Sequence, residues 1–432
     1  MQTDQVPKRF IGLDIHKKYF VAVGVDAKMN QIFGPQEAPM RYIERWAKKN
    51  LTSEDAVVLE MTTNTYIVHD ALKPLVHSVT VVHPPHVALI VRAQVKTDKK
   101  AAFTLAQLHA AGLLPGVWIP PVEVRELRAL VAHRRKMVKL GTIAKNRLHA
   151  LLQRRDIDLP EGFEPFSEDM RAWWEALKVS PLERHCLLSD LATLDFAKEQ
   201  AQTIENAIKE IAAQDERTPL LVQITGIGLL TAITILAAIG DIQRFPTAKQ
   251  LVGYSGLGTS VHASGMTYNT GHITKHGRKE LRWAMVEAAR HAVLHHPHWK
   301  AEYERLSGSI GQKKAIVAIA RKLLVVVWQV LSKETGDKFA DPTQVACGLF
   351  AFAHRVRAKN LPNGLSALQF TRDQMDRLGL GQDVLILPWG TKRFKLPPSK
   401  LVLPAPVPQV QVSKVEGLKD EAKLQAAAGE KQ

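Results

Sequence analysis

The stretch FIGLDIHKKYFVAVGV, residues 10–25, decides the fold. Two β-rich apolar runs flank a polar turn around Lys17, which is the pattern of a β-hairpin. Outward along the chain, Ala56–Leu59 and Val79–Val82 predict buried strands, and Ala101–Ala111 has a helical pattern. Strands that alternate with helices predict an α/β domain over residues 8–120. The Pro-rich stretch Leu114–Pro121 marks its end.

The composition narrows the class of protein. The 432 residues carry 58 Lys and Arg against 42 Asp and Glu, a formal net charge of +16, which favours a polyanionic partner such as nucleic acid. With 46% apolar and 23% charged residues, the chain has the composition of folded protein. Its two cysteines, Cys186 and Cys347, exclude a disulfide scaffold and fit a reducing cytosol. A membrane span is not predicted, because the best candidate, Leu229–Ile239, is too short.

Residues 121–216 predict a helical, coiled-coil arm. Between residues 123 and 155 only Glu123 and Glu126 are acidic. Further on, apolar residues recur every three or four positions from Leu187 to Ile211, the pattern of a long helical hairpin or coiled coil. Such an arm would serve as a dimerisation element, or its two helices would pack within one monomer. Its basic residues are Arg125, Arg128, Arg134, Arg135, Lys136, Lys139, Lys145, Arg147, Arg154 and Arg155.

Residues 217–338 predict a second, mostly α-helical domain. Gly226-Ile227-Gly228 lies between two apolar helical stretches, the pattern of a helix-hairpin-helix. Its glycines would let backbone N–H groups meet a phosphate, although a plain packing turn has the same pattern. Residues 339–432 follow as a C-terminal extension, whose tail from about residue 396 is predicted to be extended or disordered.

Three carboxylates lie at the ends of predicted elements. Asp14 is in the first β-rich segment. Glu60 directly follows the apolar run Ala56–Leu59. Asp98 begins a helix with Thr97 as its cap. An ionised carboxylate among apolar strand residues is costly unless a cation or hydrogen-bond donors satisfy it. Together the three could hold Mg²⁺, which prefers oxygen ligands, for phosphodiester chemistry. Each one taken singly could instead be a solvated turn residue or a helix cap.

These motifs, in this order, resemble those of the DEDD transposases of insertion sequences. They are Gly-Leu-Asp14-Ile-His-Lys, Leu-Glu60-Met-Thr and Lys96-Thr-Asp98-Lys. The resemblance implies a RuvC-like, ribonuclease-H-type α/β domain whose four acids bind Mg²⁺. The fourth acid normally follows the third by three residues, one helical turn on, and this chain has Ala101 there. We therefore expect a weakened metal site and an impaired copy, through a deliberate inactivating substitution rather than natural degeneration.

The segment Leu251–Arg282 resembles the C-terminal transposase domain of the same family, in which a serine before glycine is the catalytic nucleophile. The matching residue is Ser264, followed by Gly265, whereas Ser255 and Ser260 precede the motif position. The resemblance implies a covalent phosphoserine–DNA intermediate. Contacts to phosphate or RNA are predicted for the arm, the Gly-Ile-Gly turn and the loop near residue 279: Arg134, Arg135, Lys136, Gly226, Gly228, Lys275, Arg278, Lys279 and Arg282.

Over residues 8–335, the resemblance implies an RNA-guided DNA recombinase. A bridge RNA, or seek RNA, would base-pair with donor and target DNA, and the protein would hold the nucleic-acid backbones. We expect a homodimer that becomes a tetramer in the synaptic complex, in the bacterial cytoplasm with the nucleoid. Two alternatives are a RuvC-like structure-specific nuclease that works without Ser264, and a non-catalytic nucleic-acid-binding assembly factor.

Overall fold

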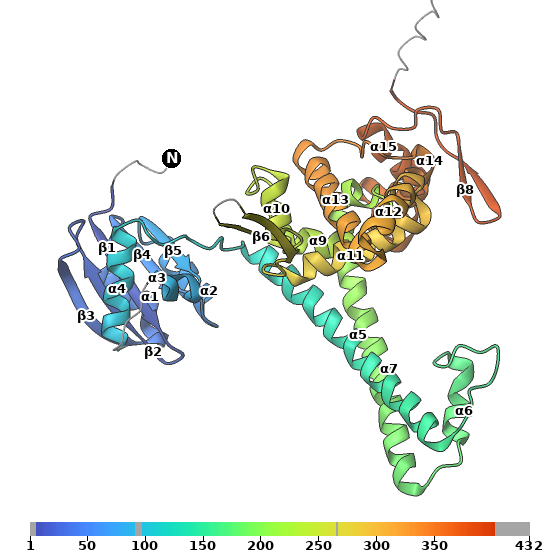
Figure 1. The fold of residues 1–432 in the computed structure, drawn as a ribbon, viewed down its shortest axis with the longest axis horizontal. Coiled ribbons are helices and arrows are strands. Elements are labelled where there is room, and N and C mark those ends of the chain that lie inside the picture. The colour runs from blue at the N-terminus through green and yellow to red at the C-terminus, as the bar shows by residue number, and fades with distance from the viewer. Residues whose placement is uncertain (1–5, 91–96, 265–266, 402–432) are drawn as a thin grey trace, which may run out of the picture. The chain divides into compact units, whose positions relative to one another are not determined.

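The structure is a computed structural model that describes residues 6–90, 97–264 and 267–401. Contacts divide the chain into two compact units, Met1–Val122 and Glu123–Gln432, each of which is described by itself (Figure 1). This division falls close to the predicted end of the α/β domain at residue 120. The predicted boundaries near residues 216 and 338 lie inside the second unit and stay predictions. The extended or disordered tail was predicted from about residue 396, and its part beyond residue 401 lies outside the described residues.

The first unit is a mixed five-stranded sheet in the order β3-β2-β1-β4-β5. The antiparallel pairs β1–β2 and β2–β3 adjoin the parallel pairs β1–β4 and β4–β5, an arrangement consistent with the predicted ribonuclease-H-type fold. Its strands are β1 (Arg9–Ile15), β2 (Tyr19–Val25), β3 (Gln31–Pro39), β4 (Asp55–Glu60) and β5 (Ser78–Val82). Its helices are the 3-10 helix η1 (Met40–Tyr42), α1 (Ile43–Asn50), α2 (Thr65–Leu72), α3 (Pro84–Ile90) and α4 (Asp98–Ala110).

The predicted hairpin, the two buried strands and the helix after them are confirmed, but β3 was not predicted. Its sequence contains Gly34 and Pro35, both of which disfavour a strand in isolation, and all of its residues are exposed or half-buried. Since β3 is the edge strand beside β2, a proline is tolerated there.

Alternating side chains give the sheet two different faces. Ile11, Leu13 and Phe20 pack against α1 and α2 on one face. On the other face, Val21, Val23 and Val58 belong to clusters that include residues of α4. Because Gly12 and Asp14 alternate with Ile11 and Leu13, they lie on the face that α4 covers.

Gly12 allows the backbone of α4 to approach β1 closely. A Cβ atom at this position would lie 2.0 Å from the carbonyl oxygen of Ala102 and 2.7 Å from the nitrogen of Ala106. We expect Gly12→Ala to destabilise the first unit by about 1–3 kcal/mol, measured by urea unfolding, because α4 must move away from the sheet. Gly116→Ala is the matched control, since its Cβ would make an ordinary 3.4 Å contact with Thr80. Equal stability of the two variants would contradict this packing.

The second unit begins with the arm, defined here as residues 123–214. The helices α5 (Val122–Arg155) and α7 (Pro181–Gln214) run side by side, which confirms the predicted helical hairpin, and η2 (Glu168–Met170) and α6 (Arg171–Ala176) lie in the connection (Figure 1). Ion pairs from Arg134 to Glu205 and from Arg147 to Asp190 join the two long helices. Leu148 and Leu187 share a buried cluster near the connection. The arm's two helices therefore pack within this chain, and its role in dimerisation stays a prediction.

The rest of the second unit gathers at the other end of the arm around one large apolar core (Figure 1). Its helices are α8 (Arg217–Val222), α9 (Leu229–Ile239), α10 (Ala248–Ser255), α11 (Lys279–His295), α12 (Pro297–Ile310), α13 (Gln312–Lys333), α14 (Pro342–Val356), α15 (Ala367–Arg377), η3 (Ala358–Asn360) and η4 (Pro362–Gly364). Two hairpins interrupt them: β6 (Thr259–Ser264) with β7 (Thr267–Ile273), and β8 (Ile386–Trp389) with β9 (Lys392–Lys395). The prediction of a mostly helical domain is thus right except for the hairpin β6–β7.

One helix of this core was overlooked as a membrane candidate. By length and composition α13 is apolar enough to cross a membrane, unlike the shorter Leu229–Ile239. Half of its apolar window is buried inside the fold, with Leu323, Leu324 and Val327 in the large core.

Candidate active site

Asp14 and Glu60 lie at the same edge of the sheet in the first unit. Strands β1 and β4 are parallel, and their last paired residues are Leu13 and Leu59. Asp14 directly follows Leu13, and Glu60 directly follows Leu59. The register therefore places both acids at the carboxyl ends of two neighbouring strands. Alternation along β4 puts Glu60 on the same face as Val58, which is the face that α4 covers.

Asp98 reaches this edge from α4. Thr97 caps the helix by accepting a hydrogen bond from the backbone N–H of Lys100, as predicted. The close packing of α4 on Gly12 then brings Asp98, in the first turn, to Asp14, two residues beyond Gly12. The Tyr19 hydroxyl donates a 2.8 Å hydrogen bond to Oδ2 of Asp98 and fixes that carboxylate.

His16 completes the group, and the sequence analysis missed it. Ligand atoms of Asp14, His16 and Asp98 lie within 4.8 Å of one another, the one such group found among the described residues. Nε2 of His16 is 3.6 Å from Oδ2 of Asp14 and 3.4 Å from Oδ2 of Asp98. Glu60 is not part of this group. The available signal was the spacing Asp14-Ile-His16, which keeps both side chains at the end of one strand.

The donor set fits a divalent cation. Burial raises the pKa of the Asp14 carboxyl, an effect that the neighbouring His16 opposes and the charge of Asp98 reinforces. Two carboxylates this close, half-buried, disfavour each other's charge, which a bound cation would relieve. Oxygen ligands of this kind suit hard cations. The residues present therefore fit a divalent metal ion.

Because the folded state raises the pKa of Asp14, its carboxylate opposes folding increasingly as the pH rises above the pKa of the unfolded chain. We expect Asp14→Asn to raise the melting temperature of the metal-free protein at neutral pH by about 2–4 °C. Asp26→Asn is the control with the opposite sign, since a hydrogen bond from the backbone N–H of Asn30 lowers the pKa of Asp26. A destabilised Asp14→Asn protein in the presence of a chelator would contradict this reading of the site.

Ala101 stands one turn along α4 from Asp98. Its backbone N–H donates to the carbonyl of Thr97 at 2.8 Å, and its side chain is half-buried. Residues three apart on a helix lie on neighbouring positions of the same face, so a longer acidic side chain here would point to the same side as Asp98.

Ser264 is an exposed residue at the end of β6, where it pairs with Thr267. Gly265, the second half of the predicted motif, lies outside the described residues. The two rival serines have internal partners: Ser255 Oγ donates to the carbonyl of Val252 at 2.7 Å, and Ser260 Oγ donates to that of His272 at 3.2 Å. Among the three, Ser264 is the one presented to solvent at a strand end.

The base of the hairpin β6–β7 is fixed by Arg282. Its guanidinium donates to the backbone carbonyls of Ser255 at 2.9 Å and Lys275 at 3.1 Å, on the two sides of the hairpin. Gly256, with φ +70°, leaves the space for this contact, because a Cβ there would lie 2.7 Å from Nη1 of Arg282. Arg282 therefore has a structural role, and its predicted contact with nucleic acid stays a prediction.

The other residues predicted to contact nucleic acid differ in whether they already form ion pairs or ring contacts within the chain. In the arm, Arg134 pairs with Glu205 at 2.6 Å, and Arg135 lies 3.6 Å from Glu280 and over the ring of Trp283. The exposed lysines Lys136, Lys275 and Lys279 present their charges to solvent, and Arg278 is half-buried.

The Gly-Ile-Gly turn lies between α8 and α9. A Cβ at Gly226 would lie 2.3 Å from the carbonyl oxygen of Ala288, so this glycine permits close packing on α11, as in the packing-turn alternative. Gly228 is exposed at the start of α9, and its role toward phosphate is a prediction.

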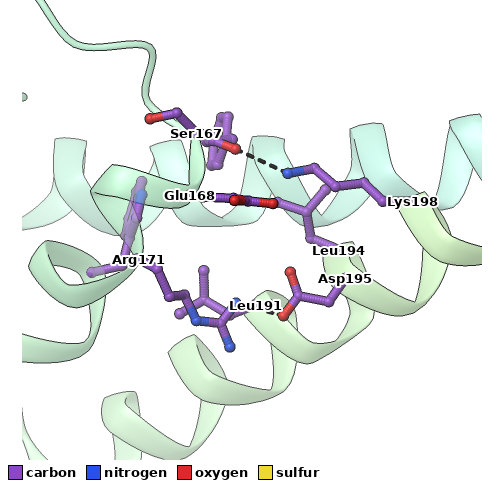
Figure 2. A pocket seen from close by; sticks show the side chains of 9 residues that line it. Ser167, Glu168, Arg171, Leu191, Leu194, Asp195 and Lys198 are labelled. Carbon is purple, nitrogen blue, oxygen red and sulfur yellow. Dashed lines mark hydrogen bonds and ion pairs between the residues drawn. The ribbon is translucent and has the colours of Figure 1, made fainter.

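A pocket of about 320 Å³ lies at the tip of the arm. None of the predicted site residues lines it. Figure 2 shows its charged lining: Lys198 donates to the carbonyl of Phe166, and Arg171 pairs with Asp195 at 2.6 Å. Glu168 is the other acid in the wall. Since acids and bases balance there, the pocket does not extend the basic surface of the arm.

Comparison with known proteins decides the family. The family model described as DEDD transposase of the IS110 type matches residues 11–155, and the model of the IS116/IS110/IS902 transposase family matches residues 218–304. The chain belongs to the IS110 family of insertion-sequence transposases. The first match contains the acidic group and Ala101, and the second contains Ser264 and the base of its hairpin.

Several known proteins resemble this IS110-family chain over most of their length. The transposase of insertion sequence element IS1111A from Coxiella burnetii is 26% identical over 336 residues, 76% of this chain and 90% of that protein. A probable family 20 transposase from Pseudomonas aeruginosa is 26% identical, covering 75% of this chain and 97% of that protein. The pilin gene-inverting protein of Moraxella bovis is 27% identical, with coverages of 75% and 96%. The family makes this chain an enzyme of transposition that acts on DNA.

Proposed function

We propose that this transposase is an RNA-guided DNA recombinase of its insertion sequence, which cuts and rejoins donor and target DNA through a phosphoserine at Ser264. The observation that carries the proposal is the meeting of Asp14 and Asp98 at one edge of the sheet, in the segment that matches the DEDD model. The exposed position of Ser264 in the second matching segment supports the second half of the active site. The resemblance to a gene-inverting protein supports recombination as the outcome.

The proposed chemistry is a pair of phosphoryl transfers. Oγ of Ser264 attacks the phosphorus of a phosphodiester, and the bond from phosphorus to the adjoining deoxyribose oxygen breaks. That oxygen leaves and takes up a proton, while the serine proton passes to solvent. In the second transfer a free hydroxyl of another strand attacks the phosphorus of the phosphoserine and loses its proton, the bond from phosphorus to Oγ breaks, and Oγ takes up a proton. A divalent cation at Asp14, Glu60 and Asp98, Mg²⁺ by the sequence prediction, would stabilise charge on the transferring phosphate.

The exposed lysines support contact with nucleic-acid backbones. Lys275 and Lys279 flank the turn that joins β7 to α11, and Lys136 lies on the arm. A cation that neutralises a phosphate gives salt-dependent, sequence-independent affinity, which suits a protein whose sequence readout is delegated to base pairing. A homodimer joined through the arm, and a tetramer in the synaptic complex, fit the exposed apolar side chains Leu182, Leu188 and Phe196 on α7. The protein would act in the bacterial cytoplasm, at the nucleoid.

The guide is tested by sequencing the nucleic acid that co-purifies with the protein from cells that carry the complete element. We expect one discrete RNA transcribed from the flank of the element. The test includes the double variant Lys275→Glu, Lys279→Glu for comparison. This variant should retain less RNA and show a shallower salt dependence of binding. A mixture of cellular RNAs, in the same proportions for both proteins, would contradict RNA guidance.

A second candidate, favoured by Ala101, is a non-catalytic nucleic-acid-binding assembly factor. It differs from the recombinase in one respect that is simple to measure. The assembly factor would bind the element's DNA but would not cleave it even after an acid is restored at position 101.

A further inference from the structure

The nitrogen Nε2 of His16 faces the carboxylates of Asp14 and Asp98 but makes no hydrogen bond to a described residue. This atom is covered from solvent, although the side chain as a whole is 37% exposed. Two ligands bound at about 2.1 Å to the same ion can be at most about 4.2 Å apart. The distances of 3.6 Å to Asp14 and 3.4 Å to Asp98 meet this limit.

The orientation of the His16 ring is fixed by its neighbours. The ring stacks on that of Tyr19 with centroids 4.6 Å apart and an interplanar angle of 23°. Tyr19 in turn donates to Asp98, so one side chain positions both the imidazole and a carboxylate. The backbone of His16 is held as well, because its N–H donates to the carbonyl of Tyr19 and its carbonyl accepts from Nδ2 of Asn64.

The composition of the donor set departs from an all-oxygen site. Ala101 supplies no ligand, and an imidazole nitrogen lies beside the two aspartates. Mg²⁺ strongly prefers oxygen ligands in near-octahedral geometry. Imidazole instead favours first-row transition ions, whose affinity for nitrogen-containing sites rises from Mn²⁺ onward along the series.

We propose that His16 is a metal ligand through Nε2 and that it shifts the preference of this site from Mg²⁺ toward first-row transition cations such as Mn²⁺. The inference rests on the proposed function only in requiring that Asp14 and Asp98 hold a cation. His16 thereby takes over part of the role of the missing fourth acid.

The test uses the full-length protein with Mn²⁺ and Mg²⁺ as probes, at constant pH and without DNA. Electron paramagnetic resonance counts free Mn²⁺ during a titration, and competition by Mg²⁺ gives the second affinity. Pulsed measurements on bound Mn²⁺ detect a directly coordinated imidazole nitrogen. We expect that nitrogen signal in the unmodified protein and its loss in His16→Gln. We also expect Mn²⁺ affinity to fall by at least about tenfold in that variant, with a smaller change for Mg²⁺, since even outer-shell losses cost roughly 10–100-fold.

Two further variants separate the possible failures. His86→Gln removes an exposed histidine of the same unit and should leave both affinities unchanged. Asp14→Asn should abolish binding of either ion. Absence of a nitrogen signal in the unmodified protein, or equal affinities with and without His16, overturns the proposal. If Asp14→Asn still abolishes binding in that case, the metal site of the proposed function stands. If neither variant changes Mn²⁺ binding, both proposals are wrong.

Discussion

Replacing Ala101 with aspartate is expected to raise metal-dependent DNA cleavage by this transposase by about 10–100-fold. The new carboxylate would lie one helical turn after Asp98 and on the same side of α4, which restores the fourth acid of the DEDD pattern. An acid in the first turns of a helix also interacts favourably with the helix dipole, so the change should not weaken α4. Cleavage of the element's own DNA ends, with and without divalent cation, measures the gain.

The matched control is Ala101→Asn, which adds a side chain of the same size without the charge. We expect it to stay at the low activity of the starting protein. A gain with asparagine equal to that with aspartate would mean that the side chain acts by shape rather than as a ligand. No cleavage with aspartate, despite intact DNA binding, would favour the assembly factor.

In the Ala101→Asp background, Ser264→Ala is expected to abolish the covalent protein–DNA adduct, a loss of at least about 10⁴-fold, because no hydroxyl remains to attack the phosphorus. Denaturing electrophoresis of labelled DNA detects the adduct, and mass spectrometry locates the modified residue. Ser260→Ala is the matched control on the same strand. Its hydroxyl donates a hydrogen bond to the carbonyl of His272, and the loss of this hydroxyl should leave the adduct in place.

Two results would contradict this role of Ser264. An adduct that persists in Ser264→Ala assigns the nucleophile to another residue. Metal-dependent cleavage that continues at the same sites without any adduct supports the structure-specific nuclease, in which water attacks at the acidic site.

The acidic half of the site could be largely predicted from the sequence, because strand alternation is a local and repetitive pattern. The parallel pairing of β1 with β4, by contrast, joins segments far apart in the chain. The apolar runs before Asp14 and Glu60 predict two strands that end on an acid, and the structure pairs these strands in parallel. His16 was missed because its importance depends on Asp98, which lies far along the chain. The spacing Asp14-Ile-His16 places the histidine near Asp14, but the sequence does not show that Asp98 also lies beside it.

The serine half could be predicted only through resemblance to a family. No local pattern reveals that Ser264 ends a strand, since the segment around it is rich in Gly, Ser and Thr. The role of Arg282 was also hidden: in sequence it is one cation of a basic cluster, and in the structure it spans two backbone carbonyls from segments on either side of a hairpin. Such contacts depend on three-dimensional proximity, which charge patterning does not encode.

The acidic group forms only while α4 packs against Gly12. Asp14 and Asp98 are 84 positions apart in the sequence, and they meet because a helix rests directly on a strand that has no side chain at the point of contact. If α4 moved away from the sheet, the chain would still contain Asp14 and Asp98, but their carboxylates would no longer lie together. The state of the acidic group can therefore be followed without metal or DNA, by how well the backbone amides of α4 resist exchange with solvent.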